Sequence, residues 1–239
     1  MLQDAIRWIR STFISIPLIV LETLAATTLG LALSLAYPKP GLIEWFKRNW
    51  ARMVLAAGFV HLSVEGGEKL EPGRNYLYCA NHLSYFDPPA LVVALGRPVR
   101  FLAKKSLLSI PLFGWAMRRA GDIAIDRGNP RAASRTLAQA AELARAGASL
   151  VIFPEGGRSP DGALQPFLSG AFRLAIQAQI PVVPVAIHGS RDVLPPGSLF
   201  IRGGIIRIAI GEPIPTAGLS AQDQDALAAL VAKAICQML

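Results

Sequence analysis

Residues 76–95, YLYCANHLSYFDPPALVVAL, combine a short apolar run, a polar motif and a second apolar run. The first run, residues 76–79, lacks polar alternation, as expected of a strand that is covered on both sheet faces. Asp87 followed by Pro88 is typical of an N-cap and a first helical position, which predicts a helix over residues 88–95. The stretch therefore predicts a strand, a turn and a helix, in the order that builds an α/β fold.

Short apolar runs and longer helical patterns alternate in the same way along the rest of the chain. Further strands are predicted at residues 100–103, 123–125, 150–153, 182–187 and 205–210, and further helices at residues 112–120, 131–145, 171–178 and 221–238. We therefore predict an α/β domain over residues 64–239, with a mostly parallel sheet covered by helices. In such a sheet, ligands usually bind beyond the carboxyl ends of the strands.

The polar motif between the first strand and its helix contains a histidine five positions before an aspartate, His82 and Asp87. Histidine is the usual general base for a hydroxyl because its unperturbed pKa lies closest to neutral. A carboxylate on the other ring nitrogen would select the tautomer and stabilise the imidazolium. Side chains five apart do not share a helix face, so the two meet only where the chain turns. The motif predicts either a catalytic pair or a helix-capping aspartate near an unrelated histidine.

Four ordered blocks resemble those of the 1-acylglycerol-3-phosphate acyltransferases, also called lysophosphatidic acid acyltransferases. They are Asn81, His82, Ser84 and Asp87; Gly121, Ile123, Ile125, Asp126 and Arg127; Phe153 through Ser159 (FPEGGRS); and Pro181 through Val185 (PVVPV). The resemblance covers residues 75–213. It implies that His82 takes the proton from an acceptor hydroxyl while Asp87 holds the ring. The alkoxide then attacks an acyl thioester directly, giving phosphatidic acid from 1-acylglycerol-3-phosphate.

Arginines in the second and third blocks suit the phosphate of such an acceptor. The guanidinium groups of Arg127 and Arg158 can each form two parallel hydrogen bonds with a phosphate. Their alternative role is surface ion pairing, for example between Arg127 and Asp126. The resemblance also implies that Glu155 and Gly156 bind the acceptor. Glu155 could instead cap a helix or bridge to Arg158.

Basic residues between the first two blocks, Lys104 and Lys105 among them, suit a polyanionic acyl donor. They would meet the phosphates of acyl-CoA, an acidic acyl-carrier protein or lipid headgroups, or else form a solvated basic face. The donor is a co-substrate, and no other cofactor is expected. No metal is expected either, because the cysteines and histidines show no metal-ligand spacing. Ser84 is predicted to form a turn hydrogen bond, since no Gly-x-Ser-x-Gly motif marks it as a nucleophile.

Two departures from the family blocks leave the acceptor open. Gly157 stands where the family usually has threonine, and Leu168 stands where a lysine is common. A different lysolipid, such as a lyso-aminolipid or lysophosphatidylglycerol, is therefore an alternative acceptor. A non-catalytic lipid-binding protein is a second alternative. A nucleic-acid binder, suggested by the sequence pI of about 10.0, lacks any recognised binding signature.

The N-terminal region is the most apolar part of a chain in which 52% of the 239 residues are hydrophobic and 17% are charged. Residues 14–37 contain one charged residue, Glu22, and would form a helix of about 36 Å, long enough to cross a hydrocarbon core. Residues 42–60 mix aromatic and basic side chains, as in an interfacial helix or a helix packed on the domain. We predict that residues 1–63 anchor the protein to a membrane. The resemblance implies the cytoplasmic face of the inner membrane, and the net charge of +8 suits anionic headgroups.

Overall fold

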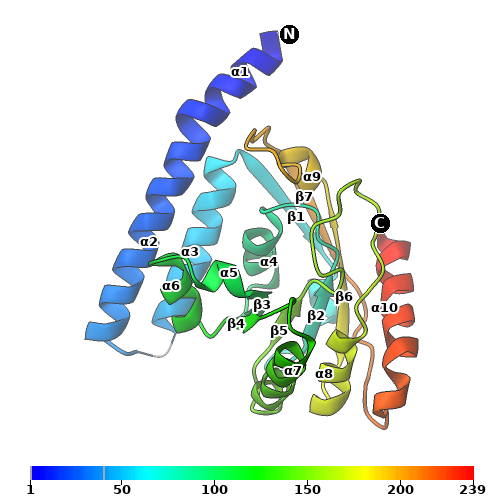
Figure 1. The fold of residues 1–239 in the computed structure, drawn as a ribbon. Coiled ribbons are helices and arrows are strands. Elements are labelled where there is room, and N and C mark those ends of the chain that lie inside the picture. Colours follow the sequence, from blue (N-terminus) through cyan, green and yellow to red (C-terminus); the bar gives the residue numbers. More distant parts are fainter. Residues whose placement is uncertain (1, 40) are drawn as a thin grey trace.

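The alternating pattern forms a seven-stranded sheet in the computed structural model, which describes residues 2–39 and 41–239 (Figure 1). The strands are β1 (Val60–Glu65), β2 (Leu77–Ala80), β3 (Arg100–Lys104), β4 (Ile123–Ile125), β5 (Leu150–Ile152), β6 (Val182–His188) and β7 (Gly204–Ile210). Their spatial order is β1-β7-β6-β2-β5-β3-β4. Only β6 and β7 pair antiparallel in this sheet, so the predicted mostly parallel sheet is confirmed.

Helices cover both faces of the sheet. They are α1 (Leu2–Arg10), α2 (Ile16–Ala36), α3 (Leu42–Ala57), α4 (Asp87–Leu95), α5 (Lys105–Leu108), α6 (Phe113–Arg119), α7 (Pro130–Arg145), α8 (Gly170–Ala178), α9 (Ser190–Val193) and α10 (Gln224–Met238). Strand β2 shows the layering, because Tyr78 and Ala80 enter one hydrophobic core with α3 and α4. Leu77 and Cys79 enter the other core with α7, α8 and α10. The predicted α/β fold is therefore confirmed, including the burial of both sheet faces.

A long N-terminal helix runs along one side of the domain (Figure 1). A π-helical turn, Ser11–Ser15, joins α1 to α2, and the helix from Gln3 to Ala36 is long and apolar enough to cross a membrane. Its outward side exposes large apolar side chains, such as Phe13 at 68% and Leu21 at 64%. Length, composition and this exposed side are compatible with the predicted anchor, whose membrane contact stays a prediction.

Helix α3 packs on the domain through one side, and the interfacial role predicted for residues 42–60 stays a prediction. Ala51, Val54 and Leu55 are buried in the core that also holds α4. The predicted helix was too long, because the chain turns at Phe59, where φ is +55°, and enters β1. The sequence analysis missed β1. The predicted boundary between residues 63 and 64 lies inside this strand and stays a prediction.

A buried ion pair ties α3 to the sheet. Nζ of Lys47 lies 3.0 Å from Oδ1 of Asp122, and the two side chains are only 10% and 4% exposed. The Lys47 ammonium also donates to the Val99 carbonyl at 2.7 Å, and the Asp122 carboxylate accepts from the Phe101 N–H at 2.8 Å. Each charge thus has further polar partners, as a buried pair requires.

We predict that Asp122→Asn lowers the free energy of unfolding by about 3 kcal/mol, because it leaves the Lys47 charge buried without an anion. Urea unfolding of the purified chain measures this change. Glu212→Gln is the matched control, since Glu212 pairs with Lys69 at 3.8 Å and is 76% exposed. The control is expected to cost less than about 1 kcal/mol. Equal losses for the two variants would contradict the prediction.

Candidate active site

Three family blocks follow the carboxyl ends of parallel strands. The first block begins after β2, the arginine of the second follows β4, and the third begins after β5. Strand β5 lies between β2 and β3, and β3 pairs with β4. The blocks therefore lie along one edge of the sheet, the edge at which ligands bind in such folds.

His82 and Asp87 meet in a turn. Nδ1 of His82 lies 2.7 Å from Oδ2 of Asp87, and this oxygen also accepts from the backbone N–H groups of Leu83 at 2.6 Å and Ser84 at 2.8 Å. Asp87 is fully buried and is the first residue of α4. The predicted N-cap role of Asp87 is wrong: Phe86 occupies that position, and the carboxylate points back into the turn instead.

The imidazole of His82 is held by the Asp87 carboxylate and by a ring stack. Its ring stacks on Phe153 with centroids 3.9 Å apart and an interplanar angle of 16°. A carboxylate only accepts, so Nδ1 carries the proton of the neutral ring and Nε2 keeps a free lone pair. The side chain is 16% exposed. The geometry leaves Nε2 as the atom that can accept a proton.

Glu155 joins the first block to the loop after the third. Oε1 accepts from the His82 N–H at 2.6 Å, and Oε2 accepts from the Gln165 N–H at 2.9 Å. The N–H of Ser159 in turn donates to the His82 carbonyl at 2.7 Å. Burial raises the pKa of the Glu155 carboxyl above its usual value. Both carboxylate oxygens thus accept from the backbone, while the predicted acceptor binding by Glu155 stays a prediction.

Arg158 lies over the ring of Tyr85, with its guanidinium carbon 3.7 Å from the ring centroid. Its Nη1 is buried and has no hydrogen-bond partner among the residues that the structure describes. A buried guanidinium N–H without an acceptor favours an anionic ligand at this position. The sequence analysis did not single out Tyr85. Its place between His82 and Asp87, in an aromatic pair with Phe86, was the available signal.

The structure brings Arg127 and Gly156 together and places the two lysines farther out. Nη1 of Arg127 donates to the Gly156 carbonyl, and burial lowers the pKa of the Arg127 guanidinium. Asp126 pairs with Lys105 at 3.2 Å, whereas the suggested pair between Asp126 and Arg127 is not formed within the described chain. Lys104 is exposed at the end of β3. The substrate contacts predicted for these four residues stay predictions.

Two further side chains of the first block have structural partners. Ser84 donates its hydroxyl to the Leu194 carbonyl at 2.8 Å and accepts from the Phe86 N–H at 3.2 Å, so its predicted turn bond is confirmed. The Asn81 amide pairs with both backbone groups of Ile187 in β6, at 2.7 and 3.0 Å. Sequence reasoning missed this contact, because the two residues lie 106 positions apart.

Comparisons with known proteins identify the family of this chain. The sequence profile of the acyltransferase family matches residues 61–188, more than half of the chain. The chloroplastic 1-acyl-sn-glycerol-3-phosphate acyltransferase BAT2 of Brassica napus is 37% identical over 173 residues, which make up 72% of this chain and 50% of that protein. The 1-acyl-sn-glycerol-3-phosphate acyltransferase beta of Homo sapiens is 32% identical over 187 residues, or 78% of this chain and 66% of that protein.

The chain spans about half to two thirds of the length of these curated relatives. Its fold also matches the crystal structure of the 1-acyl-sn-glycerophosphate (LPA) acyltransferase PlsC from Thermotoga maritima. The TM-score is 0.68 at 26% sequence identity, and the match covers 92% of this chain and 95% of that chain. Profile, identity and fold together show that this chain belongs to the acyltransferase family, as do the 1-acyl-sn-glycerol-3-phosphate acyltransferases that it resembles.

Proposed function

We propose that this protein transfers a fatty acyl group from an acyl thioester to the free sn-2 hydroxyl of 1-acylglycerol-3-phosphate, giving phosphatidic acid. The observation that carries the proposal is the contact between His82 and Asp87, with the unpaired guanidinium N–H of Arg158 in the neighbouring block. A general base near an anion site suits an acceptor that has both a hydroxyl and a phosphate. The donor is acyl-CoA or an acyl-carrier protein.

The proposed reaction needs no covalent intermediate on the protein. Nε2 of His82 takes the proton of the acceptor hydroxyl as the oxygen attacks the thioester carbonyl. Asp87 stabilises the resulting imidazolium. The tetrahedral intermediate then expels the thiolate, which recovers the proton from His82. The Ser84 hydroxyl is already committed to the Leu194 carbonyl, which argues against Ser84 as a nucleophile.

Membrane association forms part of the proposal. The exposed apolar side of the N-terminal helix would lie against lipid, and basic side chains would meet anionic headgroups on the cytoplasmic face of the inner membrane. This arrangement would give the active site access to an acceptor that carries an acyl chain.

A different lysolipid acceptor is the second candidate, and one contact favours it. Leu168 is 59% exposed, and its Cδ1 would lie 2.8 Å from a Cβ placed on Gly156. An apolar side chain therefore covers the loop beside Arg158, where the family often has a cation. Rates measured with lysophosphatidic acid, lysophosphatidylglycerol and a lyso-aminolipid distinguish the two candidates.

We predict that His82→Ala lowers kcat by about 10²–10⁴-fold, because it removes the base that accepts the hydroxyl proton. Thiol release from oleoyl-CoA in the presence of lysophosphatidic acid measures the rate. His61→Ala is the control, since His61 is exposed in β1. An unchanged rate in folded His82→Ala protein would rule out this base.

Glu155→Gln tests whether Glu155 positions His82. Glutamine offers one acceptor oxygen where two backbone N–H groups need acceptors, so we expect a loss of stability of about 1–3 kcal/mol. We also expect kcat to fall while KM for the acceptor stays constant. Urea unfolding and steady-state kinetics measure these changes. An increase in KM with unchanged stability would instead assign Glu155 to acceptor binding.

Tyr85→Leu is expected to raise KM for lysophosphatidic acid about fivefold, because the Tyr85 ring holds the Arg158 guanidinium and a cation–π contact is worth about 1 kcal/mol. Tyr85→Phe keeps the ring and serves as the matched control, with KM expected to stay within twofold. Steady-state kinetics with varied acceptor concentration measures both. A similar KM for the two variants would show that the ring contact is not used.

A further inference from the structure

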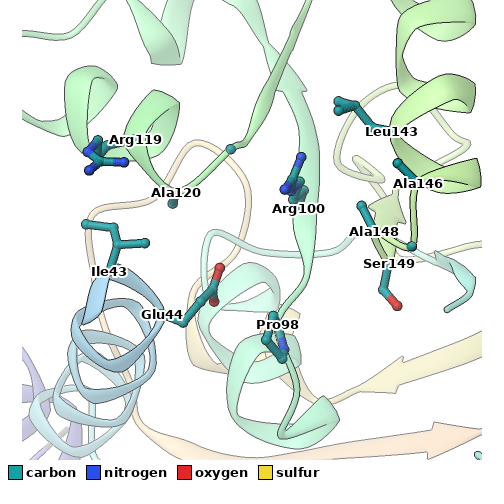
Figure 2. A pocket seen from close by; sticks show the side chains of 12 residues that line it. Ile43, Glu44, Pro98, Arg100, Arg119, Ala120, Leu143, Ala146, Ala148 and Ser149 are labelled. Atoms are coloured by element: carbon teal, nitrogen blue, oxygen red, sulfur yellow. The ribbon is translucent and has the colours of Figure 1, made fainter. Parts of the chain in front are cut away.

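A cavity of about 460 Å³ opens beside the first residues of β3 and β5, and Figure 2 shows the side chains that line it. Its walls come from the first turn of α3, the end of α6, the start of β3 and the turn between α7 and β5. Strands β3, β4 and β5 are parallel, so their first residues lie opposite to the edge that holds the family blocks. The length of β3 alone is about 13 Å. The cavity is therefore separate from the proposed active site.

Two opposite charges line this cavity without pairing with each other. Arg100 of β3 and Glu44 of α3 are both half-buried (Figure 2). Neither side chain forms a hydrogen bond or an ion pair with any residue that the structure describes. Burial raises the pKa of the Glu44 carboxyl, although Lys47 and Arg100 act in the opposite direction. Among the described residues, the Glu44 carboxylate thus has no cation, and the Arg100 guanidinium no anion, within ion-pair distance.

A second guanidinium and a glycine complete the polar side of the cavity. Arg119 lines it from the end of α6, and its Nη2 donates to the Ser34 carbonyl at 3.2 Å. Gly121 has a φ of +81°, and a Cβ at this position would lie 2.9 Å from Nε of Arg100. The glycine therefore leaves room for the Arg100 side chain, and the contact with Ser34 leaves other N–H groups of Arg119 available.

We propose that this cavity binds a zwitterionic phosphate ester, with its phosphate on Arg100 and Arg119 and its ammonium group on Glu44. Guanidinium groups bind phosphate with directed hydrogen bonds. A simple anion would leave the Glu44 carboxylate without a cation, and a simple cation would be repelled by the two arginines. Only a ligand with both charges satisfies all three side chains. The headgroup of an aminophospholipid and the free phosphate ester of an amino alcohol share this chemistry.

The apolar part of the wall agrees with a ligand that carries an alkyl portion. Ile43 and Leu143 line the cavity beside the charged residues. The cavity also lies near the end of α2, because Arg119 reaches Ser34 in that helix. A lipid headgroup could enter from the side of the N-terminal helix, and a soluble ester could enter from solvent.

Isothermal titration calorimetry with O-phosphoethanolamine tests the proposal on the full-length chain. All proteins carry Arg158→Gln, which removes the phosphate site proposed near His82, so the remaining binding reports on the cavity. We expect this parent to bind the probe and Arg100→Gln to weaken binding at least tenfold. Arg131→Gln is the control, because Arg131 lies in the first turn of α7, whereas the other end of this helix lines the cavity. Its affinity is expected to stay within twofold.

A second comparison tests the role of the carboxylate. Glu44→Gln is expected to weaken binding of O-phosphoethanolamine at least fivefold while leaving inorganic phosphate unaffected. Arg100→Gln is expected to weaken both probes. Loss of inorganic phosphate binding in Glu44→Gln to the same degree would overturn the assignment of the ammonium group to Glu44.

Vesicle flotation identifies the source of the ligand. If a lipid headgroup fills the cavity, Arg100→Gln will reduce flotation on phosphatidylethanolamine vesicles but not on phosphatidylglycerol vesicles. If a soluble ester fills it, Arg100→Gln will change calorimetric binding alone. Both results support the proposal.

Far-UV circular dichroism and thermal unfolding verify that each variant is folded, and Arg119→Gln replaces Arg100→Gln if the latter is not. The proposal is overturned if the parent binds neither probe. It is also overturned if the folded arginine variant binds the probes with the same affinity as the parent. Neither result depends on transferase activity, so the proposed reaction could fail without affecting this test.

Discussion

The carboxylate of Asp87 holds the turn on which the rest of the site depends. One oxygen accepts from the ring of His82 and from the backbone N–H groups of Leu83 and Ser84, at 2.6 to 2.8 Å. A regular helix would not bring side chains five apart together, so these bonds select the turn and orient the ring at once. Removing the acceptor would leave buried donors unsatisfied, which costs about 1–3 kcal/mol for each group. Folding and the proposed chemistry therefore depend on the same buried anion.

Contacts from distant segments complete the placement of His82. Glu155 accepts from its N–H, Ser159 donates to its carbonyl, and Phe153 stacks on its ring. All three come from the block after β5. Strand β5 pairs with β2, the strand that precedes His82. The histidine is thus preorganised by backbone bonds rather than by substrate, and a preorganised site spends less free energy on ordering during the reaction. Arg158 differs, because its buried Nη1 still lacks an acceptor.

Features that depend on local sequence patterns were predicted more completely than features that depend on long-range contacts. Strand β4 has the predicted bounds, and β2 is shifted by a single residue, since apolar runs between turn residues are readable from sequence. Strand β1 was missed because it follows α3 almost directly and pairs with β7, more than 100 positions later. The pairing of His82 with Asp87 was one of two alternatives that the local spacing left open, and the resemblance to the acyltransferases favoured it. The two amides bound by Glu155 could not be read in this way, because the first lies 73 positions from it along the chain.

The two ends of β4 carry ion pairs that differ in burial. Asp122, just before the strand, pairs with Lys47 in a buried contact and is 4% exposed. Asp126, just after it, pairs with Lys105, and these side chains are 35% and 67% exposed. An exposed pair contributes only about 0.2–1 kcal/mol, whereas breaking a buried one costs about 3–5 kcal/mol. The pair between Lys105 and Asp126 can therefore open at little cost, while the other end of the strand stays fixed to α3.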